Sequence, residues 1–208
     1  MKRLASAILI FCALMLFIPI GAANAALPAL PSKSASQTSL NGLTVAAKGP
    51  MTGYSRDQFP TWATVSGTCN ARETVLKRDG SNVVVGSDCN PTSGSWTSAY
   101  DGVTITDSSK VDIDHMVPLA EAWRSGAADW TKDDRTKFAN DLTRPQLLAV
   151  SASSNRSKGD QTPATWMPTQ TSFRCDYTKA WIAVKSYWKL SVDTAEKKAL
   201  QKELNACA

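Results

Sequence analysis

Histidine is almost absent from this sequence, since its 208 residues include one, His115. A single imidazole excludes a metal centre built on several histidine ligands, and any imidazole chemistry must take place at that position. No two cysteines stand in a Cys-x-x-Cys spacing, which argues against a structural zinc site. The chain also lacks an internal repeat, a zinc finger, a helix-turn-helix array and a long basic arm, so nothing in it predicts a reader of base edges.

The N-terminus has the pattern of a secretory signal peptide. Lys2 and Arg3 precede an apolar segment from Leu4 to Ile20, and Ala23-Asn24-Ala25 forms a cleavage site. We expect residues 1–25 to be removed and the secreted chain to begin at Ala26; an uncleaved membrane anchor is the competing interpretation. Removal of this segment lowers the formal net charge from +5 to +3, which is compatible with a polyanionic ligand without indicating one.

Four cysteines remain after this cleavage: Cys69, Cys89, Cys175 and Cys207. An even number in an exported chain predicts two disulfides. Three pairings are possible, and Cys69–Cys89 with Cys175–Cys207 is preferred because each bond then closes a loop within one region of the chain. Loops of this size stabilise a fold by about 3–4 kcal/mol each.

The remainder of the chain predicts one domain of the α+β class. Residues 26–40 are rich in Ser, Ala and Pro and carry one charge, so we expect a flexible linker there and a single domain over 41–208. Short strands are predicted at 83–85, 111–115 and 147–150, with a helix near 69–77 before them. Apolar residues at helical spacing after Cys175 predict two C-terminal helices that pack as an antiparallel hairpin.

The segment Val111-Asp112-Ile113-Asp114-His115-Met116-Val117-Pro118 concentrates the chemistry. A carboxylate beside the histidine supplies a hard oxygen ligand and a group that accepts a proton near neutral pH. Asn155, in a basic segment downstream, adds an oxygen ligand without adding charge. The ordinary alternative is a hydrogen-bonded core histidine with aspartates on the solvent face of a strand.

These two segments together resemble the HNH, or ββα-metal, nuclease class. Asp114-His115-Met116-Val117-Pro118 is similar to its first motif, and Asn155-Arg156-Ser157-Lys158 to its last. Closer still is the resemblance to small secreted bacterial HNH nucleases related to the C-terminal domain of GmrSD-type restriction enzymes. Their Tyr-x-Arg-x-x-Phe motif corresponds to residues 54–59, and the likeness covers roughly residues 50–208. It implies a ββα-metal core with additional short strands and a helix before it and the helical hairpin after it.

The resemblance also implies roles for individual residues. His115 would be the general base, and Asp114 and Asn155 would hold one Mg²⁺, with Mn²⁺ as another divalent ion that fits. The absence of a second histidine disfavours a transition metal that prefers imidazole. Asn140 matches the central asparagine, which holds the loop near the catalytic histidine. Asp112 ranks below Asp114 as a ligand, and two basic residues would contact substrate phosphates: Arg156 and Lys158.

The sequence therefore predicts a secreted, metal-dependent endonuclease that hydrolyses the phosphodiester bonds of DNA with little sequence specificity. RNA stays open as a substrate, because phosphate contacts alone do not exclude a 2′-hydroxyl. Two alternatives come from other classes of function: a catalytically silent nucleic-acid-binding module and a disulfide-linked extracellular structural protein.

Overall fold

The structure is a computed structural model that describes residues 27–208. The predicted signal peptide, residues 1–25, lies outside the described residues. Seven α-helices are found in the described part: α1 (Lys33–Gly42), α2 (Ala71–Asp79), α3 (Leu119–Arg124), α4 (Lys132–Ala139), α5 (Ala152–Lys158), α6 (Arg174–Tyr187) and α7 (Thr194–Ala206). None of these helices is both long enough and apolar enough to cross a membrane.

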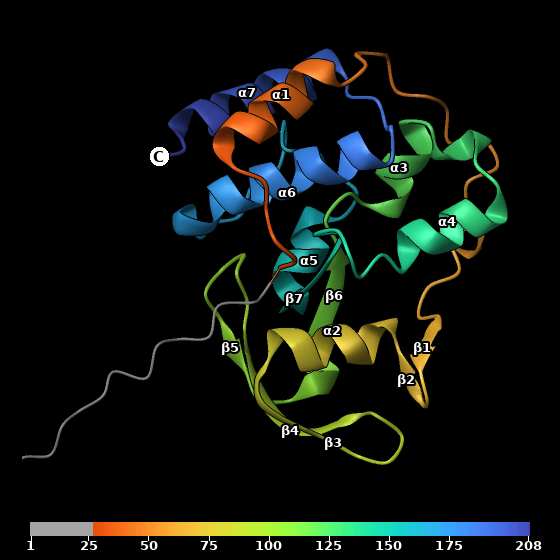
Figure 1. Cartoon of the computed structure of the whole chain (residues 1–208), viewed down its shortest axis with the longest axis vertical. Coiled ribbons are helices and arrows are strands. Elements are labelled where there is room, and N and C mark those ends of the chain that lie inside the picture. The colour runs from red at the N-terminus through yellow and green to blue at the C-terminus, as the bar shows by residue number, and fades with distance from the viewer. Residues whose placement is uncertain (1–26) are drawn as a thin grey trace, which may run out of the picture.

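Three small antiparallel sheets accompany these helices, which confirms the α+β class. They are formed by β1 (Thr64–Ser66) with β2 (Cys69–Asn70), by β3 (Ser81–Val85), β4 (Pro91–Thr97) and β5 (Thr104–Ile105), and by β6 (Val111–His115) with β7 (Leu147–Ser151). Figure 1 shows α1, α6 and α7 stacked at one end of the molecule and α2 with β3–β5 at the other. The β6–β7 pair and α5 lie between these two ends.

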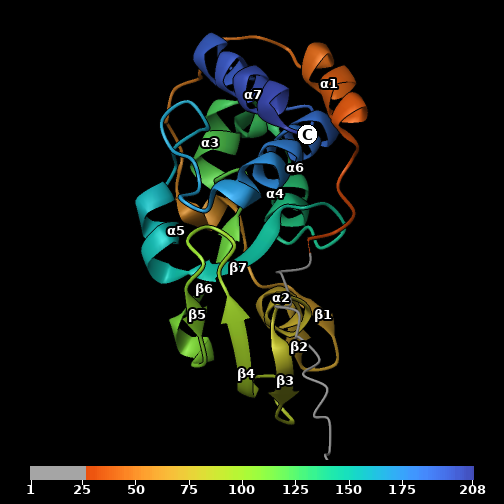
Figure 2. The same ribbon diagram turned by 90° about the vertical axis from the view of Figure 1, so that its left-hand side faces the viewer.

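The β6–β7 pair is buried on both faces because it separates two hydrophobic cores. Val111 and Ile113 of β6 contact the smaller core, formed with α2 and Trp96. Leu148 and Val150 of β7 belong to the larger core around α6. The same alternation turns the side chains of Asp112 and Asp114 away from the smaller core, towards the side of α5. This helix follows β7 directly and packs on both strands, as Figure 2 shows.

Polar caps at the N-termini explain where several helices begin. Asn70 accepts a hydrogen bond from the backbone of Glu73, whose side chain bonds back to the cap and completes a capping box at α2. Thr131 caps α4 and Asp193 caps α7.

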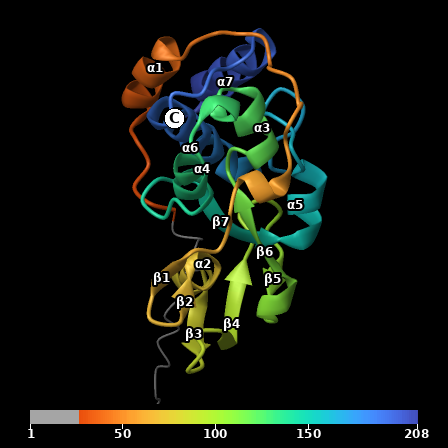
Figure 3. The ribbon, with the colours of Figure 1, turned by 90° about the vertical axis from the view of Figure 1, so that its right-hand side faces the viewer.

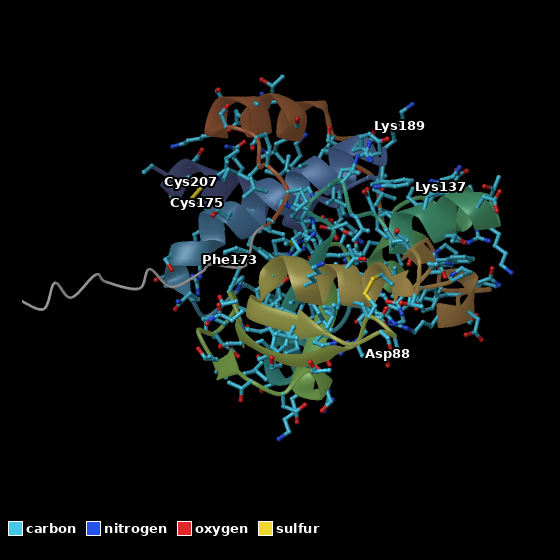
Figure 4. All side chains as sticks on the ribbon, turned by 60° about the horizontal axis from the view of Figure 1, so that its bottom comes forward. Asp88, Lys137, Phe173, Cys175, Lys189 and Cys207 are labelled. Carbon is cyan, nitrogen blue, oxygen red and sulfur yellow. A yellow bond between two sulfur atoms is a disulfide. The ribbon has the colours of Figure 1, made fainter. Side chains whose placement is uncertain are left out.

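The two predicted disulfides are confirmed. Cys69 is bonded to Cys89, and Cys175, at the start of α6, to Cys207, just after α7; Figure 4 shows the second bond. The bond holds α6 and α7 side by side as the predicted antiparallel helical hairpin.

The predicted flexible linker over 26–40 is wrong for its second half, because residues from Lys33 onward form helix α1. Ser36 and Leu40 of this helix are fully buried, and Gln37 exchanges hydrogen bonds with Gln201 of α7. A segment with so few apolar residues cannot form a core alone. The segment forms a helix here because it packs on the α6–α7 hairpin, where Leu40 and short polar side chains are buried.

Candidate functional site

His115 ends strand β6 and is 6 % exposed. Its Nε2 lies 2.9 Å from the backbone carbonyl oxygen of Ala139, at the end of α4. A carbonyl oxygen only accepts hydrogen bonds, so the ring hydrogen must sit on Nε2. The other nitrogen, Nδ1, is therefore left with a lone pair, and no described residue donates a hydrogen bond to it. A ring nitrogen with a free lone pair is what a general base requires, and in this tautomer that nitrogen is Nδ1.

A tryptophan covers the imidazole ring. Trp62 stacks on His115 with ring centroids 5.9 Å apart and an interplanar angle of 27°. The backbone φ of Trp62 is 61°, which is uncommon for a bulky residue and needs support from the surrounding structure. Asn140 gives that support, since its Oδ1 accepts from the nitrogen of Ala63 and its Nδ2 donates to the carbonyl of Pro60. The end of α4 thus positions both the ring and its cover.

Burial has a large effect on the protonation of His115. Burial lowers the pKa of the imidazole to about 3, and the hydrogen bond to Ala139 opposes this shift by raising the pKa. The positive charges of Arg56 and Lys158 lower the pKa further. The ring is consequently neutral throughout the physiological range. This differs from the ordinary value of about 6.5, at which part of the imidazole would be charged near neutral pH.

The lowered pKa predicts a loss of stability in acid. The unfolded chain takes up a proton on His115 below about pH 6.5, whereas the folded chain does not until about pH 3. The free energy of unfolding should therefore decrease by about 1.4 kcal/mol per pH unit as pH falls through this window, from this residue alone. His115→Gln should lose this contribution. Urea unfolding of both proteins in EDTA, at pH 7 and pH 4.5, measures it.

Because the parent and His115→Gln have the same acidic residues, the contributions of those residues to the pH dependence of the unfolding free energy cancel when the two proteins are compared. The difference in unfolding free energy between them should change by about 3 kcal/mol over this interval, in favour of the variant at low pH. A difference that stays constant from pH 7 to pH 4.5 would contradict the lowered pKa.

Asp114 is buried, and each of its carboxylate oxygens accepts one hydrogen bond from a side chain. Its Oδ1 accepts from Nζ of Lys158 at 2.9 Å and its Oδ2 from the hydroxyl of Tyr100 at 2.6 Å. The same Lys158 Nζ also donates to the carbonyl of His115. Burial raises the pKa of the Asp114 carboxyl and lowers that of the Lys158 ammonium, while their attraction opposes both shifts. The pair fixes the last turn of α5 on the end of β6.

This arrangement corrects the expectation for Lys158. The side chain is 0 % exposed, so it does not offer its charge to a substrate phosphate in this structure. Its spacing from Asn155 places both residues on the face of α5 that lies against β6. Arg156 lies on another face of the same helix and is exposed. Its side chain forms no hydrogen bond or ion pair with a described residue, so its guanidinium is accessible for the phosphate contact that the sequence predicts.

Asn155 meets Asp112 rather than Asp114. Its Nδ2 donates to Oδ2 of Asp112 at 3.0 Å, and both residues are partly exposed. Asp112 and Asp114 are near enough for their charges to interact. One strand face and one helix face thus bring together two carboxylates and an amide oxygen.

This donor set fits a hard divalent cation, which takes carboxylate, amide, water and phosphate oxygens. Asp114 and Asn155 would hold the ion with Asp112 beside them. No group of three or more His, Cys, Asp or Glu side chains at metal-binding spacing occurs within residues 27–208. A site here therefore depends on the amide of Asn155 and on oxygens from water or substrate.

Gln146 is a site residue that the sequence did not reveal. It is fully buried just before β7, its Oε1 accepts from the nitrogen of Val117, and its Nε2 donates to the Val117 carbonyl. Its own carbonyl accepts from the nitrogen of Met116. Gln146 therefore holds the backbone that leaves His115, a task expected of Asn140. A glutamine between a proline and two leucines gives no signal for this role without the strand pairing.

A small pocket opens beside His115. It has a volume of about 120 Å³. Its walls are formed by the end of β6, the start of α3, a residue just after α5 and the segment before β1. The lining residues are Tyr54, Arg56, Asp114, His115, Pro118, Leu119, Ala120 and Asp160. Figure 3 shows the chain segment that precedes β1 passing beside α3 and α5. Two of these residues, Tyr54 and Arg56, come from the Tyr-x-Arg-x-x-Phe motif and were given no role from the sequence.

Residues 89–203 match the family described as GmrSD restriction endonucleases, C-terminal domain. The chain belongs to this family. The matched region begins just before β4 and ends within α7, so it contains His115, Asp114 and Asn155, while Arg56 lies before it.

A fungal relative extends the likeness to most of the chain. An uncharacterized secreted protein of Arthroderma benhamiae is 58 % identical over 180 residues, which cover 86 % of this chain and 88 % of the relative. The protein is secreted, as its N-terminal pattern predicts. The narrower expectation of a bacterial group is not supported, because this relative is fungal. No solved structure matches the chain.

Proposed function

We propose that this protein is a secreted endonuclease of the HNH type that hydrolyses phosphodiester bonds in DNA. The observation that carries the proposal is the setting of His115, which lines a small pocket, whose Nε2 is held by the carbonyl of Ala139 and whose Nδ1 receives no hydrogen bond from a described residue. Membership of the GmrSD C-terminal domain family supports the class of reaction. The strand–strand–helix unit formed by β6, β7 and α5 supports a ββα-metal core.

The hydrolytic step follows from the position of His115. Its Nδ1 accepts a proton from a water molecule as the water oxygen bonds to phosphorus, and the bond from phosphorus to the 3′ oxygen breaks. The 3′ oxygen leaves with the bonding electrons and takes a proton from solvent water, which gives a 5′-phosphate and a 3′-hydroxyl. The imidazole is neutral at any pH well above 3, so its lone pair is available for this step, and the same lowered pKa makes it a weaker base than a free histidine.

Oxygen ligands on the neighbouring strand face complete the proposed site. Asp114 and Asn155 would hold Mg²⁺, or Mn²⁺, with Asp112 as a further oxygen donor. When bound, such an ion supplies charge stabilisation at the phosphate oxygens and the leaving oxygen. Lys158 keeps Asp114 in place and compensates its charge, because the ammonium is 2.9 Å from the carboxylate and buried with it.

Recognition should be largely independent of sequence. The sequence contains no zinc finger, helix-turn-helix array or long basic arm that would read base edges, and its exposed basic residues are suited to phosphates. We therefore propose cutting at many sequences, with affinity that falls as salt rises. RNA cleavage remains within reach of the same chemistry.

The decisive measurement is the nicking of supercoiled plasmid by the purified secreted chain. We expect nicked and linear products with Mg²⁺ or Mn²⁺, a complete stop in EDTA, and recovery when the ion is restored. Mapping of the ends should give 5′-phosphates spread over many sequences. Retardation of DNA without cleavage under a range of divalent ions would instead identify a silent binding module. Absence of both activities would favour an extracellular structural protein.

A further inference from the structure

Arg56 carries a positive charge that the described protein does not neutralise. Its side chain is exposed, and no described acidic side chain lies within ion-pair distance of it. In residues 27–208 the other arginines, apart from Arg156, bond to acids, carbonyls or neutral polar side chains. Examples are Arg124 with Asp160 and Arg78 with Asp79. An unpaired guanidinium beside a pocket is unusual enough in this chain to need an explanation.

The pocket that Arg56 lines is the one beside His115. Two acidic residues also line it, but both charges are already compensated, Asp114 by Lys158 and Asp160 by Arg124. The guanidinium of Arg56 is thus the one charge lining the pocket that has no partner of opposite sign among the described residues, and His115 lines the same pocket. These are the conditions for binding an anion next to the proposed base.

The backbone that carries Arg56 is firmly held. Tyr54 packs edge-on against Trp123, with ring centroids 5.8 Å apart, and Phe59 is 1 % exposed in the large core. Between them, Gln58 accepts hydrogen bonds from Arg135 through its backbone and side-chain oxygens. The Tyr-x-Arg-x-x-Phe motif therefore has two aromatic anchors and a charged side chain projected from a fixed turn.

We propose that Arg56 is a catalytic residue whose guanidinium binds the scissile phosphate beside His115. The inference rests on the proposed nuclease function and names a substrate-contacting group for it. A guanidinium donates two parallel hydrogen bonds to phosphate oxygens and keeps its charge at all relevant pH values. It stabilises the negative charge that builds on the non-bridging oxygens as water attacks phosphorus.

The test compares Arg56→Ala and Arg56→Lys with Lys110→Ala. Lys110 is an exposed lysine that directly precedes β6, so its removal takes the same charge from the far end of the strand that His115 ends. Single-turnover cleavage of a labelled duplex should slow by about 10²-fold or more in Arg56→Ala. Arg56→Lys should recover part of the rate, because lysine keeps the charge and loses the paired donors. Lys110→Ala should retain the parent rate.

A binding measurement separates phosphate contact from a structural role. In a His115→Ala background, which prevents cutting, the plot of log affinity against log salt should become less steep by about 0.9 when Arg56 is replaced. Melting temperatures should match that of the parent, since the side chain is exposed. Rates and salt slopes for Arg56→Ala that equal those for Lys110→Ala would overturn the proposal.

The two proposals fail in different ways. If the parent protein cuts DNA and Arg56→Ala cuts equally well, the nuclease function stands and the role of Arg56 is lost. If the parent binds DNA without cutting, the salt slope still tests the phosphate contact, and an unchanged slope removes it. A parent that neither cuts nor binds nucleic acid overturns both.

Discussion

Replacement of His115 by alanine is expected to lower the rate of DNA cleavage by at least about 10²-fold, the usual effect of removing a general base. The reason is geometric. The ring nitrogen that faces Ala139 is committed as a donor, so Nδ1 alone can accept a proton from water, and His115 is the one histidine in the sequence. Single-turnover cleavage of a labelled duplex in saturating Mg²⁺ measures the chemical step.

A second variant controls for the space that alanine leaves below Trp62. His115→Gln offers an amide that can donate to the Ala139 carbonyl, and it supplies no base. It should be as slow as alanine and fold more stably. Added imidazole should restore part of the rate to His115→Ala, where it has room, and little to His115→Gln. Cleavage by either variant at the parent rate would rule out His115 as the base.

The largest expected effect on stability comes from Lys158. Lys158→Met removes the ammonium and leaves Asp114 as a buried carboxylate with the Tyr100 hydroxyl as its remaining partner. Loss of one member of a buried ion pair costs about 3–5 kcal/mol. For a domain of this size that corresponds to a fall in melting temperature of roughly 6–20 °C. Thermal unfolding followed by circular dichroism in EDTA provides the measurement.

The matched variants are Lys132→Met and the double variant Asp114→Asn with Lys158→Met. Lys132 is an exposed lysine in the first turn of α4, and its loss should change stability by no more than about 0.5 kcal/mol. The double variant should recover much of the loss, because the asparagine is neutral and still accepts from Tyr100. If Lys158→Met melts like Lys132→Met but binds DNA less tightly, Lys158 contacts substrate after all and the buried position is wrong.

Elements with a strong local signal were predicted well. The strand at 111–115 has its predicted bounds because apolar residues alternate up to a proline that ends it. The helical hairpin and both disulfides followed from apolar spacing and from an even number of cysteines in an exported chain. Helix α1 gave no such signal, because its stability comes from α6 and α7, which lie more than 130 residues away in the sequence.

The sequence predicted that a histidine, an aspartate and an asparagine from two segments lie together, and it predicted their interactions only in part. Residue types and spacing brought His115, Asp114 and Asn155 to one place, and the structure brings the same segments together. Which partner each side chain takes depends on strand register and helix rotation, and neither can be read from spacing. The burial of Lys158 and the role of Gln146 both follow from that register.

The contact between the first and last helices has a consequence for export. Gln37 of α1 bonds to Gln201 of α7, 164 residues later, and the core that includes Met116 and Val117 also includes Leu40 and Leu204. Such a core has high contact order and cannot close until the C-terminal helix has been made available. A chain threaded N-terminus first through a translocation channel would therefore keep this core open until α7 had emerged.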